Sequence, residues 1–213
     1  MRPERLWVIG AGGHAKVVIA TARAIGWQVA GVWDDNPALK GTSVLDAPVI
    51  GSIPDAQWWR GQPEPAFLAI GSNRVRQTLA RQIEPGGGWA TLVHPTAWRE
   101  PSAVLAAGVL VCAGVILQPA VQVGEHAILN TGAIVEHDGR VGAFAHLAPR
   151  VCLAGSVTVE EGAFVGTGAV VIPGGRIGAW AGVGAGAAVI RPVTDGTRVA
   201  GVPARVLPVS IME

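Results

Sequence analysis

The sequence carries a six-residue repeat of branched aliphatic side chains that runs from Leu105 to Val189. The repeat holds at fifteen consecutive positions, and the residue two places before each is almost always small or Val. The fifteen positions are Leu105, Val111, Leu117, Val123, Leu129, Val135, Val141, Leu147, Leu153, Val159, Val165, Val171, Ile177, Val183 and Val189. A strict period of six fits neither an α-helix nor an ordinary antiparallel meander.

This period predicts a solenoid of stacked coils. Because residues i and i−2 of a strand point to the same face, each unit offers one large and one small inward side chain and then a corner. Three units close a triangular coil of 18 residues, and parallel pairing between coils buries the aliphatic side chains in columns. Five coils are expected, with a height of roughly 24 Å at about 4.8 Å per strand. Gly often follows the aliphatic residue, and the Gly-rich corners would supply positive φ where it is needed.

Composition excludes several classes of protein. The chain has 213 residues and a net charge of +1, which argues against nucleic-acid or membrane-surface binding through bulk charge. Cys112 and Cys152 give neither a zinc spacing nor a disulfide framework. The first nine residues do not make a secretion signal, and no apolar run qualifies as a membrane span. A cytoplasmic protein is expected.

The N-terminal segment has the layout of a nucleotide-binding βαβ half. A strand over Leu6–Ile9 meets the turn Gly10–Lys16, a helix follows to Gly26, and a second strand over Gln28–Trp33 ends in acidic residues. The turn lacks the G-x-G-x-x-G spacing, so phosphate contact by Gly12, Gly13 and His14 and a purely structural turn both remain open. Asp34 or Asp35 would accept from a ribose hydroxyl or a base N–H, or would lie in a solvated turn.

A second candidate contact follows the strand expected over 66–70. Gly71, Ser72 and Asn73 lie at the carboxyl end of that strand, where open α/β sheets bind ligands, and Ser72 or Asn73 would cap the next helix. The expected fold class is α/β plus all-β, with a small Rossmann-like domain over 1–95 and a β-helix over 96–192. Residues 193–213 are expected to cap the open end of the solenoid.

Three of the five histidines, His126, His137 and His146, fall in the repeat. They are 11 and 9 residues apart, so no two share an 18-residue column, and a metal site would need a second subunit. Acid–base chemistry is the other interpretation, because Asp138 follows His137 and a carboxylate stabilises the imidazolium. A solvated corner histidine is the alternative.

Neither cysteine has an adjacent base, so neither is expected to be a nucleophile.

Motifs along nearly the whole chain resemble one family of hexapeptide-repeat acyltransferases. The matching residues are Gly10–Lys16, Asp34–Asp35, Ile70–Asn73, Val93–Pro95, Asn130–Asp138, Phe144–Pro149 and Gly201–Ala204. The family is the sialic acid O-acetyltransferase-like group, which includes N-acetyltransferases of nucleotide-linked 4-amino-4,6-dideoxy sugars of the perosamine and bacillosamine type. The resemblance implies a left-handed β-helix, a cytoplasmic homotrimer with active sites between subunits, acetyl-CoA as co-substrate, no metal, and a role in polysaccharide biosynthesis.

The resemblance also implies roles for individual residues. His137 is the general base, and Asp138, which replaces the Glu of some members, raises its basicity. His146, Gly155, Thr167 and Ala185 match acetyl-CoA positions, and Asn130 matches an acceptor-sugar position. The positions that match nucleotide-sugar contacts are Gly12, Gly13, His14, Asp34, Asp35, Gly71, Ser72 and Asn73.

The expected reaction is direct attack of the sugar 4-amino group on the thioester, with His137 as base and the Gly155 N–H steadying the oxyanion. Three alternatives stay open: O-acetylation of a sialic acid or another sugar hydroxyl, a metal-dependent lyase of the carbonic-anhydrase kind, and a scaffold without catalysis. The sequence does not separate uridine from guanosine nucleotides.

Overall fold

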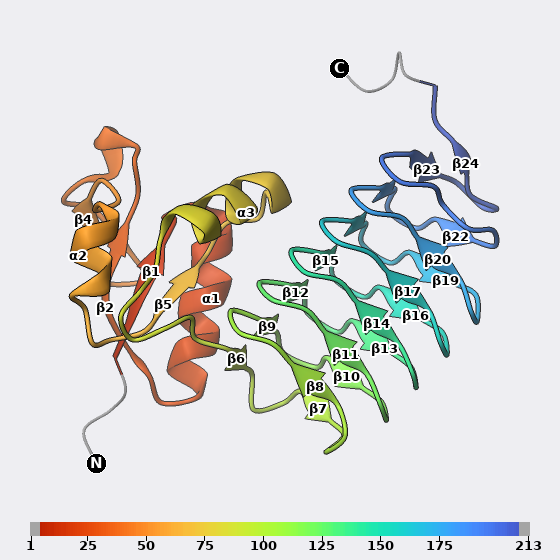
Figure 1. Ribbon diagram of the computed structural model, residues 1–213, viewed down its shortest axis with the longest axis horizontal. Coiled ribbons are helices and arrows are strands. Elements are labelled where there is room, and N and C mark those ends of the chain that lie inside the picture. The colour runs from red at the N-terminus through yellow and green to blue at the C-terminus, as the bar shows by residue number, and fades with distance from the viewer. Residues whose placement is uncertain (1–4, 209–213) are drawn as a thin grey trace. The chain divides into compact units, whose positions relative to one another are not determined.

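The computed structural model describes residues 5–208 of the chain. The chain divides into two compact units, one ending at Pro95 and the other beginning at Thr96 (Figure 1). Each unit has its own core of buried hydrophobic side chains.

The first unit is an open α/β sheet with helices between the strands. Its elements are β1 (Arg5–Ile9), α1 (Gly13–Ala24), β2 (Gln28–Trp33), the 3-10 turn η1 (Pro37–Leu39), β3 (Ser43–Val44), β4 (Ala47–Gly51), α2 (Ala56–Arg60), β5 (Ala66–Leu68), α3 (Asn73–Gln82) and β6 (Leu92–Val93). The sheet order is β3-β4-β2-β1-β5, and only the β3–β4 pair is antiparallel.

This strand order places a topological switch point beside β1. The chain moves from β1 outward to β2 and β4, then returns to pair β5 with the other side of β1, where Ile9 lies opposite Leu68. The turns that follow β1 and β5 therefore open at the same edge of the sheet. Ligands bind at such a switch point in open α/β sheets, so the expected arrangement of the two glycine-containing turns is present.

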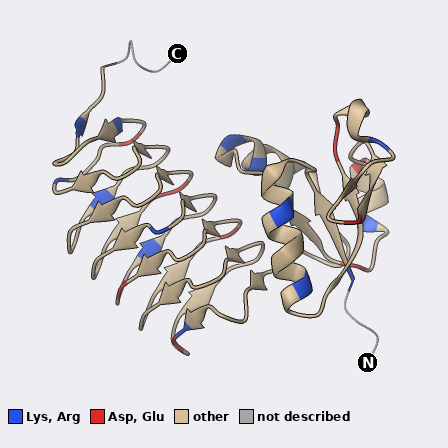
Figure 2. Ribbon diagram, turned by 180° about the vertical axis from the view of Figure 1, so that it is seen from behind, with Lys and Arg blue, Asp and Glu red and all other residues tan. Residues whose placement is uncertain are grey.

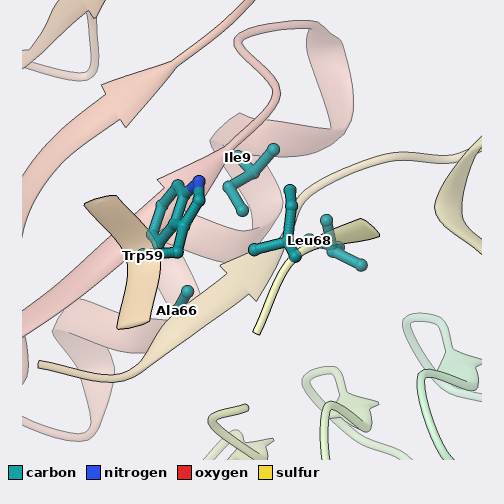
Figure 3. Close-up of a cluster of buried hydrophobic side chains, with 5 residues drawn as sticks. Ile9, Trp59, Ala66 and Leu68 are labelled. Carbon is teal, nitrogen blue, oxygen red and sulfur yellow. The ribbon is translucent and has the colours of Figure 1, made fainter. Parts of the chain in front are cut away.

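Large side chains fill one face of this sheet. Trp59 is fully buried against Ile9, Ala66 and Leu68 (Figure 3). Trp7, Trp33 and Trp58 pack at its border, with ring centroids 5.1 to 5.8 Å apart. Because successive residues of a strand alternate between faces, the buried Leu6 and Val8 of β1 point to the opposite side.

The second unit is a left-handed parallel β-helix whose strands form three sheets. The first sheet contains β7 (Trp98–Arg99), β10 (Ile116–Leu117), β13 (Ile134–Val135), β16 (Cys152–Leu153), β19 (Val170–Val171) and β22 (Ala188–Val189). The second sheet contains β8 (Val104–Leu105), β11 (Gln122–Val123), β14 (Arg140–Val141), β17 (Thr158–Val159) and β20 (Arg176–Ile177). The third sheet includes β9 (Leu110–Val111), β12 (Ile128–Leu129), β15 (His146–Leu147), β18 (Phe164–Val165), β21 (Gly182–Val183), β23 (Arg198–Ala200) and β24 (Arg205–Val206).

The register of the sheets matches the repeat. Leu117 pairs with Val135 and Val135 with Leu153, so each residue lies over the one 18 positions later in the chain. The fold class expected from the sequence is therefore confirmed. Strand β7 lies within the expected β-helix range of 96–192 but before the aliphatic repeat, because Arg99 occupies the repeat position without being aliphatic.

The C-terminal segment continues the solenoid before it turns back. β23 pairs in parallel with β21, and β24 then pairs antiparallel with β23. The antiparallel strand covers the last edge of the third sheet. The final residues of the expected cap, 209–213, lie outside the described residues.

Glycine has two roles at the corners: it supplies positive φ at seven of them, as expected, with Gly108 and Gly132 as examples, and it allows close approach between coils. The residue with positive φ is the third after the inward aliphatic, and at several corners it is a larger residue, such as His126, Asp138, Phe144 or Trp180. The glycine directly after the aliphatic is needed for close approach instead. A Cβ at Gly142, for example, would lie 2.6 Å from the backbone nitrogen of Glu161 on the next coil.

Candidate active site

His137 and Asp138 lie together at the corner between the first and second sheets, directly after β13. The His137 Nδ1 and Asp138 Oδ2 atoms are 2.8 Å apart, and the His137 side chain is 61% exposed, so a substrate has access to the ring. Asp138 has a φ of 58°, a left-handed conformation that Asp tolerates better than most residues. That backbone turn brings its carboxylate beside the preceding imidazole.

This contact fixes the chemistry of the ring. A carboxylate only accepts hydrogen bonds, so Nδ1 of His137 carries a hydrogen and donates a hydrogen bond to the Asp138 carboxylate. The Nε2 atom is then left with a free lone pair. A neutral imidazole in this tautomer is suited to take a proton from an attacking amine or hydroxyl.

Gly155 provides the space that Nε2 occupies. It lies one coil beyond His137, and a Cβ at Gly155 would be 2.4 Å from the His137 Nε2 atom. The adjacent Ser156 donates its N–H to the His137 carbonyl at 2.8 Å, which fixes the two corners together. Within residues 5–208, the N–H of Gly155 donates to no protein acceptor, so it can donate to a ligand beside Nε2.

Asn130 and His146 meet in a different part of the solenoid. His146 is buried on β15, and its Nε2 lies 3.3 Å from the Asn130 Nδ2. The Asn130 Oδ1 accepts the Thr131 N–H at 2.8 Å, which orients the amide so that Nδ2 donates to His146. The ring of Phe164 packs edge-on against His146, with centroids 5.3 Å apart.

Apart from His146 on β15, the predicted site residues of the second unit therefore fall on two edges of the triangular solenoid. The corner that holds His137, Asp138 and Gly155 is called the His137 edge below. Asn130, Thr167 and Ala185 belong to the corners between the third and first sheets, called the Thr167 edge, and Thr167 and Ala185 occupy equivalent places on consecutive coils. One side of the triangle separates the two edges, roughly 15–20 Å at about 3.3 Å per residue.

In the first unit, the two aspartates hold loops in place. The Asp34 Oδ2 accepts the N–H of Ala11 in the glycine turn at 2.7 Å. The Asp35 Oδ1 accepts the Ile53 N–H at 2.9 Å. The Asp34 Oδ1 also accepts the Asn36 N–H at 2.9 Å within the turn, and Asp35 is exposed, so the two carboxylates lie in a solvated turn and also join loops at the carboxyl edge of the sheet. Each carboxylate keeps further lone pairs for a ligand.

Arg76 is the residue of this region that the sequence did not single out. Its side chain is 1% exposed, and its Nη2 donates to the Asn73 Oδ1 at 2.9 Å. Asn73 therefore uses its side chain on Arg76. Of the two residues expected to cap helix α3, Ser72 therefore holds the N-cap position, but its side chain makes no capping hydrogen bond. Only the helical spacing from Asn73 to Arg76 could have signalled this pair.

Comparison with known proteins places this geometry in a family. Residues 5–83 match the model of the PglD N-terminal domain. A solved mutant of the perosamine N-acetyltransferase from Caulobacter crescentus, in complex with CoA and GDP-perosamine, is 43% identical, with a TM-score of 0.88, over 95% of this chain and 96% of that one. The acetyltransferase domain of PglB from Neisseria gonorrhoeae, in complex with acetyl coenzyme A, is 33% identical, with a TM-score of 0.86, over 96% of this chain and 100% of that one.

The chain belongs to the family of acetyl-CoA-dependent nucleotide-sugar N-acetyltransferases. A curated relative, the uncharacterized protein L142 of Acanthamoeba polyphaga mimivirus, is 31% identical over 103 residues. That match spans 48% of this chain and 20% of the viral protein.

The thiol of Cys112 in this N-acetyltransferase is unsuited to nucleophilic attack. Cys112 is buried, and burial raises the pKa of its thiol to about 12, which makes it a poor nucleophile. Within residues 5–208, no three His, Cys, Asp or Glu side chains are gathered so as to hold a metal ion. Over the same range, no helix is both long and apolar enough to cross a membrane.

A groove of about 840 Å³ lies along the second sheet of the N-acetyltransferase, with Gln122, Arg140 and Thr158 in its lining. None of the residues predicted to bind acetyl-CoA or the sugar lines it. The charged residues are sparse along the solenoid as a whole (Figure 2). The residues predicted to bind acetyl-CoA and the sugar therefore lie outside this groove.

His14 makes the stability of the N-acetyltransferase depend on pH. Burial, with a smaller effect of the Arg76 charge, lowers the His14 pKa from 6.5 to about 4. As the pH falls, the unfolded chain takes up this proton first, so the free energy of unfolding decreases between pH 6.5 and 4. From pH 7 to 5 we expect a loss of about 2 kcal/mol from this group.

Urea unfolding at pH 7 and pH 5, followed by tryptophan fluorescence, tests this expectation in the wild type and in His14→Gln. The variant is expected to lose less stability at pH 5 by about that amount, because Gln does not titrate. An equal pH dependence in the two proteins would contradict the buried, neutral state of His14.

Proposed function

We propose that this enzyme transfers the acetyl group of acetyl-CoA to the 4-amino group of a nucleotide-linked 4-amino-4,6-dideoxy sugar. GDP-perosamine is the first candidate acceptor, because the 43% identical relative was solved in complex with it and with CoA. The observation that carries the proposal is the His137–Asp138–Gly155 geometry, in which a base of defined tautomer lies beside an amide N–H that is available to a ligand.

The proposed chemistry is a direct transfer in a ternary complex. The sugar amine attacks the thioester carbonyl carbon, and Nε2 of His137 takes a proton from the nitrogen as the C–N bond forms. Asp138 stabilises the resulting imidazolium, and the Gly155 N–H donates to the oxyanion of the tetrahedral intermediate. The C–S bond then breaks, and the CoA thiolate leaves and takes up the proton that the imidazolium releases.

The nucleotide sugar is proposed to bind at the switch point of the first unit. Gly12, Gly13 and His14 would contact the diphosphate at the start of α1, opposite Gly71, Ser72 and Asn73 at the start of α3. Asp34 and Asp35 would accept from the ribose or the base. A cavity of about 230 Å³, lined by Asp35, Ile53, Pro54 and Leu79, offers a place for the base beside Asp35.

We place the complete active site between two copies of the chain. His137 and Gly155 belong to one edge, and the proposed acetyl-CoA residues Thr167 and Ala185 belong to another, so no single copy presents both sets together. In a homotrimer, the His137 edge of one copy faces the Thr167 edge of the next, which also brings in Asn130 and His146. The first sheet supports association, because it exposes an apolar column that includes Trp98 at 60% and Val170 at 47%.

We place this reaction in the cytoplasm and in polysaccharide biosynthesis.

A complementation experiment tests this shared site. His137→Ala damages one edge and Ala185→Trp blocks the other, so each variant alone is expected to be inactive. Random co-assembly of equal amounts restores both edges at about a quarter of the sites in a cyclic oligomer. Co-expressed, co-purified variants should therefore recover activity, whereas a preparation that stays inactive although both chains are present would contradict a shared site.

Thiol release from acetyl-CoA tests the function itself. The purified protein is incubated with acetyl-CoA and GDP-perosamine, a UDP-linked 4-amino-4,6-dideoxy sugar or free sialic acid. We expect release with a 4-amino nucleotide sugar and none with sialic acid. Release with sialic acid alone would establish O-acetylation, and no release with any acceptor would overturn acetyl transfer to these sugars.

A further inference from the structure

The buried guanidinium of Arg76 lies under the loop between β5 and α3, at the proposed nucleotide-sugar site. It is 1% exposed, although Arg is rarely buried to this extent. Its Nη1 donates to the Ile70 carbonyl at 2.8 Å and to the Gly71 carbonyl at 3.4 Å. Burial lowers the Arg76 pKa to about 10, so the group remains a cation near neutral pH.

These bonds determine where the neighbouring N–H groups point. In a trans peptide, the C=O and N–H point in opposite directions. The Ile70 carbonyl shares its peptide with the Gly71 N–H, and the Gly71 carbonyl shares its peptide with the Ser72 N–H. Because Arg76 draws both carbonyls inward, both N–H groups point outward.

The outward N–H groups are accessible and ready to donate. Gly71 and Ser72 are exposed, and within the described part of the chain neither N–H donates to another protein group. β1 and β5 meet closely at this point, since the Ala69 N–H donates to the Ile9 carbonyl at 2.7 Å. The glycine turn after β1 therefore opens beside these donors. Consecutive backbone N–H groups that point the same way bind anions.

We propose that Arg76 is a positioning residue that aims the N–H groups of Gly71 and Ser72 at the diphosphate of the nucleotide sugar. This inference rests on the proposed function of the site. Arg76 acts in two ways: its hydrogen bonds hold the orientation of the two peptides, and its charge polarises them so that the outward N–H groups become stronger donors. The two N–H groups donate to the diphosphate and not to the nucleoside.

The contribution of the diphosphate is separated from that of the nucleoside by measuring the binding of a nucleoside diphosphate and of its nucleoside. GDP and guanosine are titrated into the full-length protein by calorimetry, together with UDP and uridine. Arg76→Gln is expected to weaken binding of the preferred diphosphate roughly tenfold or more and that of the nucleoside less than about twofold. Arg76→Lys should fall between, since an ammonium keeps the charge but not the planar fork. Arg81→Gln removes an exposed charge from the same helix and serves as the matched control.

Ser72→Pro tests the same idea without a change at the buried residue. Ser72 has a φ of −70°, which proline adopts, so this substitution removes the N–H with little strain. Compared with Ser72→Ala, it should bind the diphosphate more weakly by about tenfold. This pair of variants tests whether the Ser72 N–H binds the diphosphate even if Arg76→Gln does not fold.

Kinetics give a further readout. In Arg76→Lys, the KM for the nucleotide sugar should rise, while kcat and the KM for acetyl-CoA stay near the wild-type values, because only uniform binding of one substrate is lost. Equal losses of affinity for diphosphate and nucleoside in Arg76→Gln would overturn the role of Arg76. Equal binding of the diphosphate by Ser72→Pro and Ser72→Ala would do the same. Either result would leave the proposed function standing. A wild-type protein that binds neither GDP nor UDP would overturn the proposed function, and the inference with it.

Discussion

His137→Ala is expected to reduce kcat by roughly 10²- to 10⁴-fold, which is the usual contribution of a positioned general base. The KM values for acetyl-CoA and the nucleotide sugar should change little, because the ring acts on the reacting nitrogen and not on the rest of either substrate. His137→Asn should be as inactive as the alanine variant, since an amide is polar but does not take up the proton. Thiol release under saturating substrate measures all three.

The control for this experiment is Glu136→Gln, which changes a charge at the neighbouring residue. It should retain activity close to that of the wild type. The thermal unfolding midpoint of His137→Ala should also match the wild type, because the side chain is largely exposed. Turnover by His137→Ala within about threefold of the wild type would remove His137 from the proton transfer.

Gly155→Ala is expected to lose almost as much activity as His137→Ala while it remains folded. The added Cβ would lie 2.4 Å from Nε2 of His137, so the imidazole must move away from the place where it acts. The imidazole is the far end of an exposed side chain, so its displacement costs little stability. We therefore expect a loss of about 10²-fold or more in kcat with a small change in the unfolding midpoint.

The double variant His137→Ala/Gly155→Ala separates this explanation from a general distortion. If the alanine at position 155 acts through the histidine, the double variant should be no less active than His137→Ala alone. Gly61→Ala is the matched control, because a Cβ there makes only ordinary contacts of 3.4 Å or more. Additive losses in the double variant would show that Gly155 acts independently of His137.

The repeat made the second unit predictable in detail. A period of six sets which residue points inward, and the 18-residue coil sets the register, so both the strands and their partners follow from the sequence. Strand β7 does not follow from the repeat, because the repeat position there is occupied by Arg99, which is exposed. The close-approach role of the glycines directly after the aliphatic residue could not be predicted, because the distance to the next coil's backbone is a property of the packed solenoid.

The site was predictable only where its members are neighbours in sequence. His137 and Asp138 are adjacent, so their contact could be anticipated, but the place of Gly155 beside Nε2 needs the stacking of coils. Arg76 sits on a helix whose other residues are mostly exposed or half-buried, so nothing in the pattern marks it as buried. Its importance appears only when the carbonyls that it binds are known.

The position of the acetyl group in the product tests the account most directly. The wild-type protein is incubated with acetyl-CoA and GDP-perosamine or a UDP-linked 4-amino-4,6-dideoxy sugar, and the product is examined by mass spectrometry and NMR. The account predicts one added acetyl group, held as an amide on the 4-nitrogen, with none formed by His137→Ala. An ester on a sugar hydroxyl, or an unmodified acceptor in each case, would contradict it.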